Sequence, residues 1–423
     1  MNKVGYLTES GKYFTQEEAV IEAKRCLLCE NNHCGENCPI GVNPKEVIRL
    51  VADSKIEEAV DLLRENNPIA AICSRVCPYE SYCVGGCKNS NLEEPIMIPY
   101  IEKFLTECEK DYKWKSENKC NKINKKDKKV AIIGSGPSGL SCSAMLAREG
   151  YDVTLIEERE DFGGWLSYGI PPHRLPKHAI RQDLEYLDSL GIKFRNNTKV
   201  GKDITIEDLR EEGFDALLIS TGLNKGRILK VKGFEYEGVM SAVEFLAEAK
   251  SKDGNINVGK SAVIIGGGDV AMDCGTTAKL TGYEKVRLVV RNGLEDMTAS
   301  KKELNYLQFV NVPIFDNFDS VEILGDENNK VCGMTFKGTN DSSMMTIEAD
   351  TIIFAVGQMS EGINEIAPVE LDERGTVITD NFKTNIDDIF ATGDIVKGQK
   401  TACFATALGK DAAKSIDEYL KTK

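Results

Sequence analysis

One pattern occurs twice in this chain of 423 residues: a short β-branched run that ends in a glycine-rich loop. The first copy is the run 130–133 followed by GSGPSG at 134–139, and the second is the run 262–265 followed by GGGDVA at 266–271. A strand, a glycine loop and a helix in this order begin a βαβ unit that holds the pyrophosphate of a dinucleotide at the helix N-terminus. The chain is therefore predicted to contain two similar nucleotide-binding domains of the α/β class.

The first glycine loop has the complete context of a dinucleotide site. Gly134 permits the tight turn, Gly136 lets the backbone approach the pyrophosphate, and Gly139 lets helix and strand pack closely. The next strand, at 153–156, is followed by Glu157, 23 residues after Gly134. A carboxylate at this place accepts hydrogen bonds from the ribose hydroxyls. An ordinary glycine-rich turn is the alternative interpretation.

The second glycine loop lacks the corresponding acid. Its second strand, at 286–290, is followed by Arg291 and Asn292. No carboxylate is in place for a ribose 2′-hydroxyl, and only one Arg is in place for a 2′-phosphate. This pattern predicts a dinucleotide site but leaves NAD and NADP open.

A third signal, Ala391-Thr392-Gly393-Asp394, follows the apolar pair 389–390. Its Asp can accept hydrogen bonds from flavin hydroxyls. Two dinucleotide domains, the second inserted in the first, suit hydride transfer from a nicotinamide to a flavin. Because such transfer needs alignment and dryness more than acid–base chemistry, no catalytic side chain is predicted. Four cysteines of this half are isolated in the sequence and are interpreted as small buried apolar residues: Cys142, Cys274, Cys332 and Cys403.

Cysteine dominates the first part of the chain, where eight of the 14 cysteines fall between Cys26 and Cys87. The first cassette is Cys26-x2-Cys29-x4-Cys34-x3-Cys38-Pro39, and the second is Cys73-x3-Cys77-Pro78-x4-Cys83-x3-Cys87. In two-cluster ferredoxins the fourth cysteine of a run binds the other cluster. By that logic one [4Fe–4S] cluster takes Cys26, Cys29, Cys34 and Cys87. The other takes Cys38, Cys77, Cys83 and one more ligand, for which Cys73 is the simplest choice. Structural zinc is the alternative.

Charge and hydropathy exclude several classes of partner. Lys and Arg number 53 against 67 Asp and Glu, so the net charge is −14 and nucleic acid is not expected as a partner. No apolar run approaches the roughly 18 residues of a membrane span. Residues 1–10 lack the pattern of a signal peptide. These features predict a soluble cytoplasmic protein with no membrane partner.

The predicted fold is an α-helical iron–sulfur domain followed by two Rossmann-like domains. Residues 1–112 form the all-α domain with both clusters, and the Lys- and Asn-rich stretch 113–129 is a linker. An FAD-binding domain comprises 130–226 and 360–423, and an NAD(P)-binding domain at 227–359 is inserted in it. In the first domain, Thr15 and Glu18 form a capping box. Apolar residues of 47–63 have the spacing of one helix, which Asn66-Asn67-Pro68 ends.

Motifs spread over almost the whole chain resemble one family. They are RCLLC at 25–29, RVCP at 75–78, CVGGC at 83–87, GGWL at 163–166, GIP at 169–171, RLP at 174–176 and GGGDVAMD at 266–273. This order resembles the small-subunit family of glutamate synthase. That family includes the flavin–iron–sulfur half of dihydropyrimidine dehydrogenase and the large subunit of the electron-bifurcating ferredoxin–NADP transhydrogenase. The GGWL and GGGDVA segments and the short length are most similar to the NAD-dependent dihydropyrimidine dehydrogenase subunits.

The resemblance implies site residues that spacing does not show. The flavin site it implies, with the loop glycines, comprises Gly134, Gly136, Ser138, Gly139, Glu157, Gly164, Trp165, Arg174, Val200, Gly393 and Asp394. The nicotinamide site comprises Gly267, Gly268, Asp269, Val270, Arg291, Asn292 and Gly357. In several members a Glu or Gln on the helix after the second cassette is a cluster ligand, and Glu102 matches it. Cys73 is then a spare cysteine, and a solvated surface glutamate is the alternative for Glu102.

The resemblance implies an electron-input subunit in a hetero-oligomer. Electrons from NADH would pass through FAD and two [4Fe–4S] clusters to a partner, which is expected to be an FMN-containing dihydropyrimidine dehydrogenase subunit. NADH is favoured over NADPH because Asn292 stands where NADP-using members commonly have a second Arg, and this weakens a phosphate clamp. A glutamate synthase large subunit or a bifurcating transhydrogenase flavoprotein is the alternative partner. A zinc-stapled scaffold with a vestigial nucleotide fold is the alternative of another class.

Overall fold

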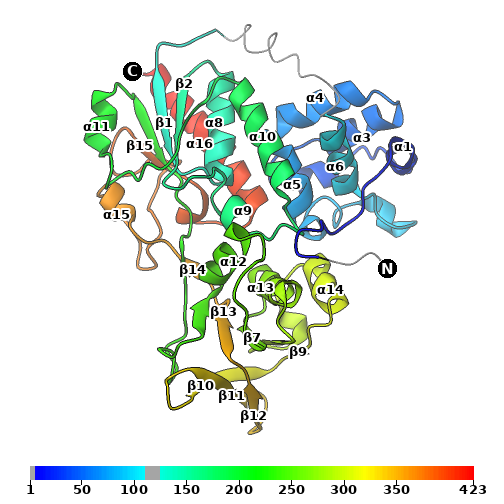
Figure 1. Cartoon of the computed structure of the whole chain (residues 1–423). Helices are drawn as coiled ribbons and strands as arrows, with labels where there is room; N and C mark the ends of the chain where they lie inside the picture. The colour runs from blue at the N-terminus through cyan, green and yellow to red at the C-terminus, as the bar shows by residue number, and fades with distance from the viewer. Residues whose placement is uncertain (1–4, 110–123) are drawn as a thin grey trace. The chain divides into compact units, whose positions relative to one another are not determined.

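The computed structural model describes residues 5–109 and 124–423. Most of the predicted linker at 113–129 lies outside these described residues. The chain divides into two compact units (Figure 1). Unit 1 contains the described part of 1–9 together with 168–176 and 224–359, and unit 2 contains 10–167, 177–223 and 360–423, as far as they are described.

The first part of unit 2 is a group of short helices. They are α1 (Gln16–Lys24), α2 (His33–Glu36), α3 (Pro44–Ala52), α4 (Ile56–Asn66), α5 (Ala70–Val76) and α6 (Ile98–Cys108), with 3₁₀ turns η1 (Tyr79–Ser81) and η2 (Lys88–Asn91). The predicted capping box begins α1, where Glu18 N donates to Thr15 Oγ1 (3.2 Å) and Thr15 N donates to Glu18 Oε2 (2.9 Å). These helices hold the cysteine-bearing loops between them.

The predicted single helix over 47–63 is wrong, because the chain forms α3 and α4 there. Ser54 has a φ of +58°, in the left-handed region that a helix cannot continue through. Lys55 N donates back to Leu50 O (2.8 Å), which closes the end of α3 in a Schellman-like turn. Apolar spacing continued across the break, so the pattern did not reveal it. The predicted end of the second helix is confirmed, since α4 ends at Asn66 before Pro68.

The second part of unit 2 is a five-stranded parallel sheet. Its order is β15 (Ile389–Ala391), β4 (Ala216–Ile219), β1 (Lys129–Ile133), β2 (Asp152–Ile156) and β3 (Lys193–Arg195). All four residues of β4 and four of five in β1 are buried, as expected of parallel strands covered on both faces. Helices α8 (Pro137–Arg148) and α16 (Ala402–Lys421) pack against each other, and the remaining helices are α9 (Trp165–Tyr168), α10 (Lys177–Ser189), α11 (Ile206–Glu211) and α15 (Ile363–Ile366).

Unit 1 repeats this architecture with a second parallel sheet. Its order is β6 (Val239–Ser241), β13 (Thr351–Phe354), β7 (Ser261–Ile265), β8 (Lys285–Val289) and β9 (Ile314–Phe315). Helices α12 (Ala242–Ser251), α13 (Asp269–Thr281) and α14 (Lys301–Phe309) accompany it, with the turn η3 (Leu294–Asp296). The α/β prediction with two similar nucleotide-binding folds is confirmed, and each predicted strand agrees with an observed one to within a residue at either end.

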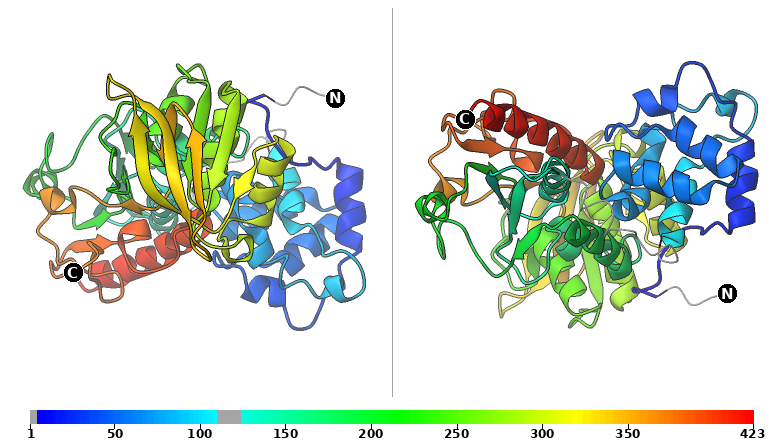
Figure 2. Two further views of the ribbon diagram at one scale, coloured as in Figure 1. Left: turned by 90° about the horizontal axis from the view of Figure 1, so that it is seen from below. Right: turned by 90° about the horizontal axis from the view of Figure 1, so that it is seen from above.

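A separate antiparallel sheet in unit 1 was not predicted. It consists of β10 (Phe318–Gly325), β11 (Val331–Gly338) and β12 (Met344–Glu348) (Figure 2). Five of the eight residues of β11 are buried, and among them Met334 and Phe336 belong to the core of this unit. A two-stranded ribbon of β5 (Lys225–Gly226) and β14 (Gln358–Met359) joins the chain where it enters and leaves the unit.

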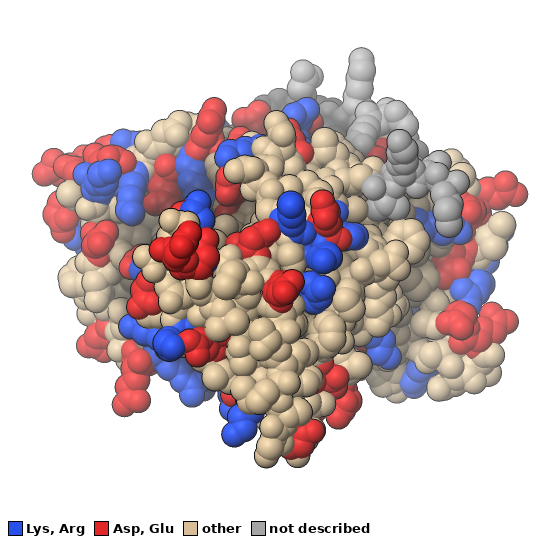
Figure 3. Space-filling view, turned by 60° about the horizontal axis from the view of Figure 1, so that its bottom comes forward, with Lys and Arg blue, Asp and Glu red and all other residues tan. Residues whose placement is uncertain are grey.

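The surface in Figure 3 carries charges of both signs. Acidic and basic side chains are interspersed on the face in Figure 3, and neither sign forms a continuous patch there. Among the described residues, the longest apolar helical stretch falls short of what a membrane crossing requires.

Candidate functional site

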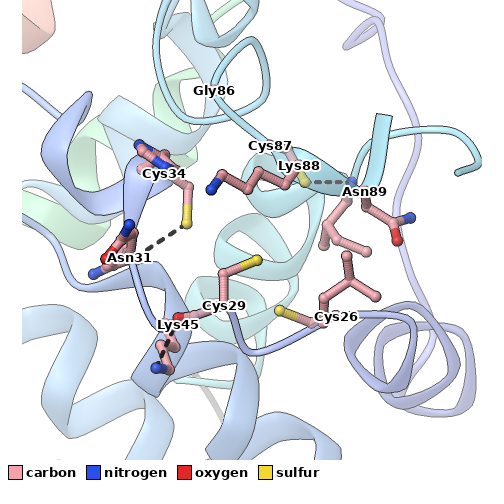
Figure 4. Close-up of a pocket in the computed structure, with 13 residues that line it drawn as sticks. Cys26, Cys29, Asn31, Cys34, Lys45, Gly86, Cys87, Lys88 and Asn89 are labelled. Atoms are coloured by element: carbon pink, nitrogen blue, oxygen red, sulfur yellow. Dashed lines mark hydrogen bonds between the residues drawn. The ribbon is translucent and has the colours of Figure 1, made fainter. Parts of the chain in front are cut away.

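Four cysteines of the two cassettes line one cavity in the α-helical part of unit 2. Cys26 follows α1, Cys34 lies on α2, and Cys87 precedes η2, while Cys29 lies in the loop between α1 and α2. Their sulfur atoms point into the same space (Figure 4). This is the set of four that the spacing predicted for the first cluster.

Backbone and lysine contacts hold these loops in place. Ile96 N donates to Cys87 Sγ (3.4 Å), and Lys45 Nζ donates to Cys29 O (2.8 Å). Burial and the neighbouring cysteines raise the pKa of Cys34 to about 11 and also raise that of Cys26. Thiolates crowded in this way need a cationic centre to compensate them, so the donor set fits an iron–sulfur cluster.

A second group of candidate ligands lies near Glu102 on α6. Burial and the Glu102 carboxylate raise the pKa of Cys38 to about 11, and the same two causes raise that of Cys83. Cys77 contributes to the raised pKa of both cysteines. Burial raises the pKa of Glu102 itself to about 7. Three thiols and one carboxylate are thus brought together, and they fit a second cluster with an oxygen ligand.

Cys73, the other candidate for the eighth ligand, is buried on α5, with its Sγ 3.7 Å from Thr406 Oγ1 of α16. The causes of the raised pKa values of Cys38 and Cys83 include Glu102.

The first glycine loop has the close approaches that its glycines predict. Gly134 has a φ of +101°, and a Cβ there would lie 2.6 Å from Ser220 O. A Cβ on Gly139 would lie 2.1 Å from Gly134 O, and Gly136 is the N-cap of α8. The loop therefore presents bare backbone at a helix N-terminus, as a pyrophosphate site requires.

Glu157 is anchored at the end of β2. Its Oε2 accepts a hydrogen bond from Ser135 N (3.1 Å) and another from the Ser135 hydroxyl, and its Oε1 accepts from Arg159 N (3.1 Å). Ser135 Oγ in turn accepts from Gly163 N (2.8 Å). These hydrogen bonds orient the carboxylate beside the glycine loop, and Ser135 links Gly163 to the carboxylate.

Three further flavin-site candidates also lie in unit 2. Gly164 has a φ of +54°, and a Cβ there would lie 3.2 Å from the Gly136 Cα. Trp165 begins α9 directly after it. Val200 is buried and forms a bridge with Ile204 in the same unit.

Two buried oxygens at the end of β15 test the fit of a flavin. Within the described residues, Thr392 Oγ1 and Asp394 Oδ1 are buried and have no hydrogen-bond partner. Burial raises the pKa of Asp394 to about 6, which Lys400 partly offsets. A Cβ on Gly393 would lie 2.3 Å from Ser138 Oγ, so this turn adjoins the first turn of α8. Buried acceptors without donors indicate a missing polar ligand, and the hydroxyls of FAD would supply it.

Arg174 has carboxylate partners that sequence reasoning missed. In unit 1 its buried guanidinium lies 2.7 Å from Asp273 Oδ2 and 2.9 Å from Glu303 Oε1. Burial raises the pKa of Asp273 to about 7, although Arg174 acts in the opposite direction. Asp273 lies one helical turn after Asp269 on α13. This i, i+4 spacing places both carboxylates on one face of the helix, and it was the sequence signal that could have indicated a basic partner.

The chain that follows β8 forms hydrogen bonds with the second glycine loop. Gly266 has a φ of +143°, and a Cβ there would lie 2.4 Å from Ala355 O. Thr298 N and Ala299 N both donate to Gly267 O (3.1 Å), and Asp269 Oδ1 accepts from Ser300 N (2.7 Å).

The remaining nicotinamide-site candidates lie close to these elements in sequence. Gly268 is the N-cap of α13, and Val270 lies in its first turn. Gly357 follows β13 with a φ of +109°. Arg291 and Asn292 are exposed after β8, and Arg291 Nε lies 3.5 Å from Asp319 Oδ2 of β10. Because the sheet that carries Asp319 was not predicted, this contact was not predicted either.

One of the four cysteines that are isolated in the sequence differs from its predicted character. Cys332 is exposed on β11 rather than buried. Cys142, Cys274 and Cys403 are buried, as predicted.

Comparison with known proteins matches nearly the whole chain. The family model of pyridine nucleotide-disulphide oxidoreductases matches residues 128–409, and that of dihydropyrimidine dehydrogenase domain II, 4Fe-4S cluster, matches residues 3–114. The NAD-dependent dihydropyrimidine dehydrogenase subunit PreT of Escherichia coli K12 is 39% identical over 421 residues, covering 100% of this chain and 99% of the relative. The glutamate synthase [NADPH] small chain of the same organism is 30% identical, covering 96% and 93%.

A solved structure shows the same fold at lower similarity. Mycobacterium tuberculosis FprA in complex with NADPH superposes with a TM-score of 0.59 at 17% identity, over 70% of this chain and 85% of that one.

Proposed function

Because the chain belongs to the pyridine nucleotide-disulphide oxidoreductase family, in the group that includes PreT and the glutamate synthase small chains, we propose that it is the electron-input subunit of a larger enzyme. It is an NAD(P)H-dependent oxidoreductase that binds FAD and a 4Fe–4S cluster. The proposal adds a second cluster, NADH as the donor, and a partner subunit that receives the electrons. A partner subunit of some kind accords with the subunit and small-chain names of the relatives.

The observation that carries the proposal is the pair of ligand groups in unit 2. One is the cavity lined by Cys26, Cys29, Cys34 and Cys87, and the other comprises Glu102, Cys38 and Cys83 with Cys77 beside these two cysteines. When bound, FAD would take a hydride from the nicotinamide, and the clusters would carry the electrons onward one at a time. An enzyme that used its electrons at the flavin would not need these clusters, so the electrons are proposed to leave the chain.

The residues proposed for each cofactor follow from the site described above. The glycine loop at 134–139, Glu157 and Asp394 would hold FAD, and the loop at 266–271 with Arg291 would hold the nicotinamide cofactor. The family resemblance adds further residues to each proposal: Ser138, Gly164, Trp165, Arg174, Val200 and Gly393 for FAD, and Asn292 and Gly357 for the nicotinamide cofactor. The proposed domains are 1–112 for the clusters, 130–226 with 360–423 for FAD, and 227–359 for NAD(P).

Charges near Arg291 support NADH as the donor. Glu295 and Asp296 lie on the turn η3 after β8, and the Arg291 guanidinium already has Asp319 beside it. A 2′-phosphate beside Arg291 would meet the Asp319 carboxylate, which disfavours NADPH.

The proposed partner is an FMN-containing subunit of a dihydropyrimidine dehydrogenase, and the 39% identity to PreT supports it. The second candidate is a glutamate synthase large subunit or a bifurcating transhydrogenase flavoprotein. The 30% identity to a glutamate synthase small chain supports this candidate. Anaerobic purification from native cells, followed by mass and flavin analysis of what co-purifies, separates them. An FMN protein of similar size supports the first candidate, a far larger partner supports glutamate synthase, and recovery of the chain alone contradicts an electron-input subunit.

Iron analysis tests the eighth ligand. Glu102→Ala should reduce the iron content from roughly eight to roughly four atoms per chain, because one [4Fe–4S] cluster loses a ligand. Cys73→Ala is the matched control and should keep all of the iron. Loss of a cluster in Cys73→Ala alone would give the ligand role to Cys73. Zinc without iron or flavin in the anaerobically purified chain would overturn the proposal in favour of a zinc-stapled scaffold.

A further inference from the structure

A tyrosine hydroxyl joins the loop of the second cysteine cassette to the segment that leads into α16. Tyr82 Oη donates to Gln399 Oε1 (2.9 Å) and lies 3.5 Å from Thr401 Oγ1. Both segments belong to unit 2, although 317 positions of sequence separate Tyr82 from Gln399. Thr401 is the N-cap of α16, and its side chain accepts from Phe404 N (3.2 Å). The hydroxyl therefore contacts the chain at the point where α16 begins.

The same segment also holds the turn that carries the flavin-site aspartate. Lys400, the residue after Gln399, donates from Nζ to Asp394 O (2.7 Å) and to Val396 O (2.6 Å). The buried oxygens Asp394 Oδ1 and Thr392 Oγ1 are the acceptors to which hydroxyls of FAD would donate. Two successive residues, 399 and 400, thus connect the tyrosine to the flavin-site turn.

On the other side, Tyr82 belongs to a loop that its own backbone holds in shape. Tyr82 N and Val84 N both donate to Tyr79 O (3.1 Å), and Gly86 N donates to Tyr82 O (3.0 Å). Cys83, a proposed ligand of the second cluster, is the next residue in this loop. A displacement of Tyr82 is therefore passed directly to Cys83.

We propose that the Tyr82 hydroxyl is a positioning group that fixes the separation between the second cluster site and the flavin site. In the step that depends on this separation, the reduced flavin is oxidised by one electron and the cluster is reduced by one electron. The rate of such a transfer falls steeply as the distance between the two cofactors increases. Tyr82 would therefore affect this step and not the reaction with NADH, because its contacts lie in unit 2 and the second glycine loop lies in unit 1. The inference rests on the proposed function, with FAD beside Asp394 and Cys83 as a ligand.

Variants of the full chain with its cofactors, purified anaerobically, test this role. Tyr82→Phe removes the hydroxyl and keeps the ring, Gln399→Leu removes the acceptor, and a double variant combines the two. Tyr100→Phe is the matched control on α6 of the same unit, where the edge-on contact with Phe14 (5.6 Å between ring centroids) does not need the hydroxyl. The readouts are iron and FAD per chain, amide hydrogen exchange of 396–401 by mass spectrometry, and stopped-flow spectra that separate flavin reduction from cluster reduction.

The expected result is a change in one step only. Tyr82→Phe should keep its iron and FAD, and the amides of 396–401 should exchange about threefold faster, because one partly exposed hydrogen bond is lost. Flavin reduction by NADH should keep its rate, whereas the cluster reduction that follows should be about threefold slower because the two sites are less well positioned. Gln399→Leu should change both readouts in the same direction, and the double variant should be no slower than Tyr82→Phe, since the two side chains form one interaction. Tyr100→Phe should match the wild type.

Several outcomes would overturn the inference. Unchanged hydrogen exchange and unchanged cluster reduction in Tyr82→Phe would mean that the hydroxyl positions nothing. Slower flavin reduction by NADH in this variant would assign the effect to a general disturbance of the fold, and additive effects in the double variant would mean that Tyr82 and Gln399 act separately. A wild-type chain without FAD, or with only roughly four irons, would overturn the proposed function itself, which differs from a fully loaded wild type whose Tyr82→Phe variant behaves identically.

Discussion

Lys410 Nζ donates a 2.6 Å hydrogen bond to the carbonyl oxygen of Ile40, two residues after Cys38. The same ammonium donates to the Asn66 carbonyl oxygen, also at 2.6 Å. One charged group on α16 thus fixes both the loop that carries Cys38 and the end of α4. Burial lowers the pKa of Lys410 because it removes water from around the ammonium group.

Replacement of this lysine should weaken the second cluster site. Lys410→Met leaves two carbonyl oxygens without their charged donor, and we expect a loss of about 3 kcal/mol in the free energy of unfolding. Iron content and thermal unfolding of the anaerobic chain measure the effect. Lys414→Met is the control one turn further along, where the exposed ammonium pairs with Asp411 (2.7 Å). Equal stability of the two variants would contradict a structural role for Lys410.

The buried Arg64 should be among the most sensitive positions of unit 2. Its Nε donates to Glu109 Oε1 (2.6 Å), its Nη1 is paired with Asp183, and all three side chains are at most 2% exposed. Arg64→Met leaves two buried carboxylates uncompensated, at a cost of about 3–5 kcal/mol. Urea unfolding measures this loss in the free energy of unfolding. The control is Arg49→Met, which breaks ion pairs at the surface and should cost less than about 1 kcal/mol.

Asp319 should limit the use of NADPH. Asp319→Asn removes the carboxylate that lies 3.5 Å from Arg291 Nε. We expect the ratio of kcat/KM for NADPH to kcat/KM for NADH to rise about threefold. This factor corresponds to the loss of a surface ion pair worth about 0.6 kcal/mol. Steady-state flavin reduction with both cofactors measures the ratio. In an Arg291→Ala background the same substitution should have no effect, and a gain there would disprove the role of Arg291. Asp326→Asn, beyond the end of β10, is the surface control.

Asp394 should make FAD binding depend on pH. Its pKa in the flavin-free chain is raised from 3.8 to about 6 by burial, and flavin hydroxyls would donate to its ionised form. FAD binding then favours the deprotonated carboxylate, so affinity should rise about fourfold between pH 5.5 and 7.5 and level off above. Fluorescence titration of the flavin-free chain measures this. Asp394→Asn should bind FAD more weakly and without that slope, while Asp411→Asn should behave like the wild type. A flat wild-type profile would remove Asp394 from the flavin site.

Elements whose patterns are confined to short stretches of chain could be predicted from the sequence. The strand, glycine loop and helix around 130–148 depend on backbone geometry within one βαβ unit, and so do those around 261–281. The grouping of Cys26, Cys29, Cys34 and Cys87 could also be predicted, because cassette spacing in known two-cluster proteins carries that information. Glu102 came from family resemblance, since a carboxylate on an amphipathic helix looks the same whether it faces solvent or a cluster.

The sequence by itself therefore determined the α/β architecture, the two glycine loops and most of the predicted ligands, because each depends on residues with a characteristic local spacing. The tertiary structure alone decided that Ser54 breaks a continuous apolar pattern into two helices, that Asp319 reaches Arg291, and that Lys410 reaches the Ile40 carbonyl oxygen. These features depend on which distant surfaces pack together. That choice minimises the free energy of the whole chain, and no local pattern records it.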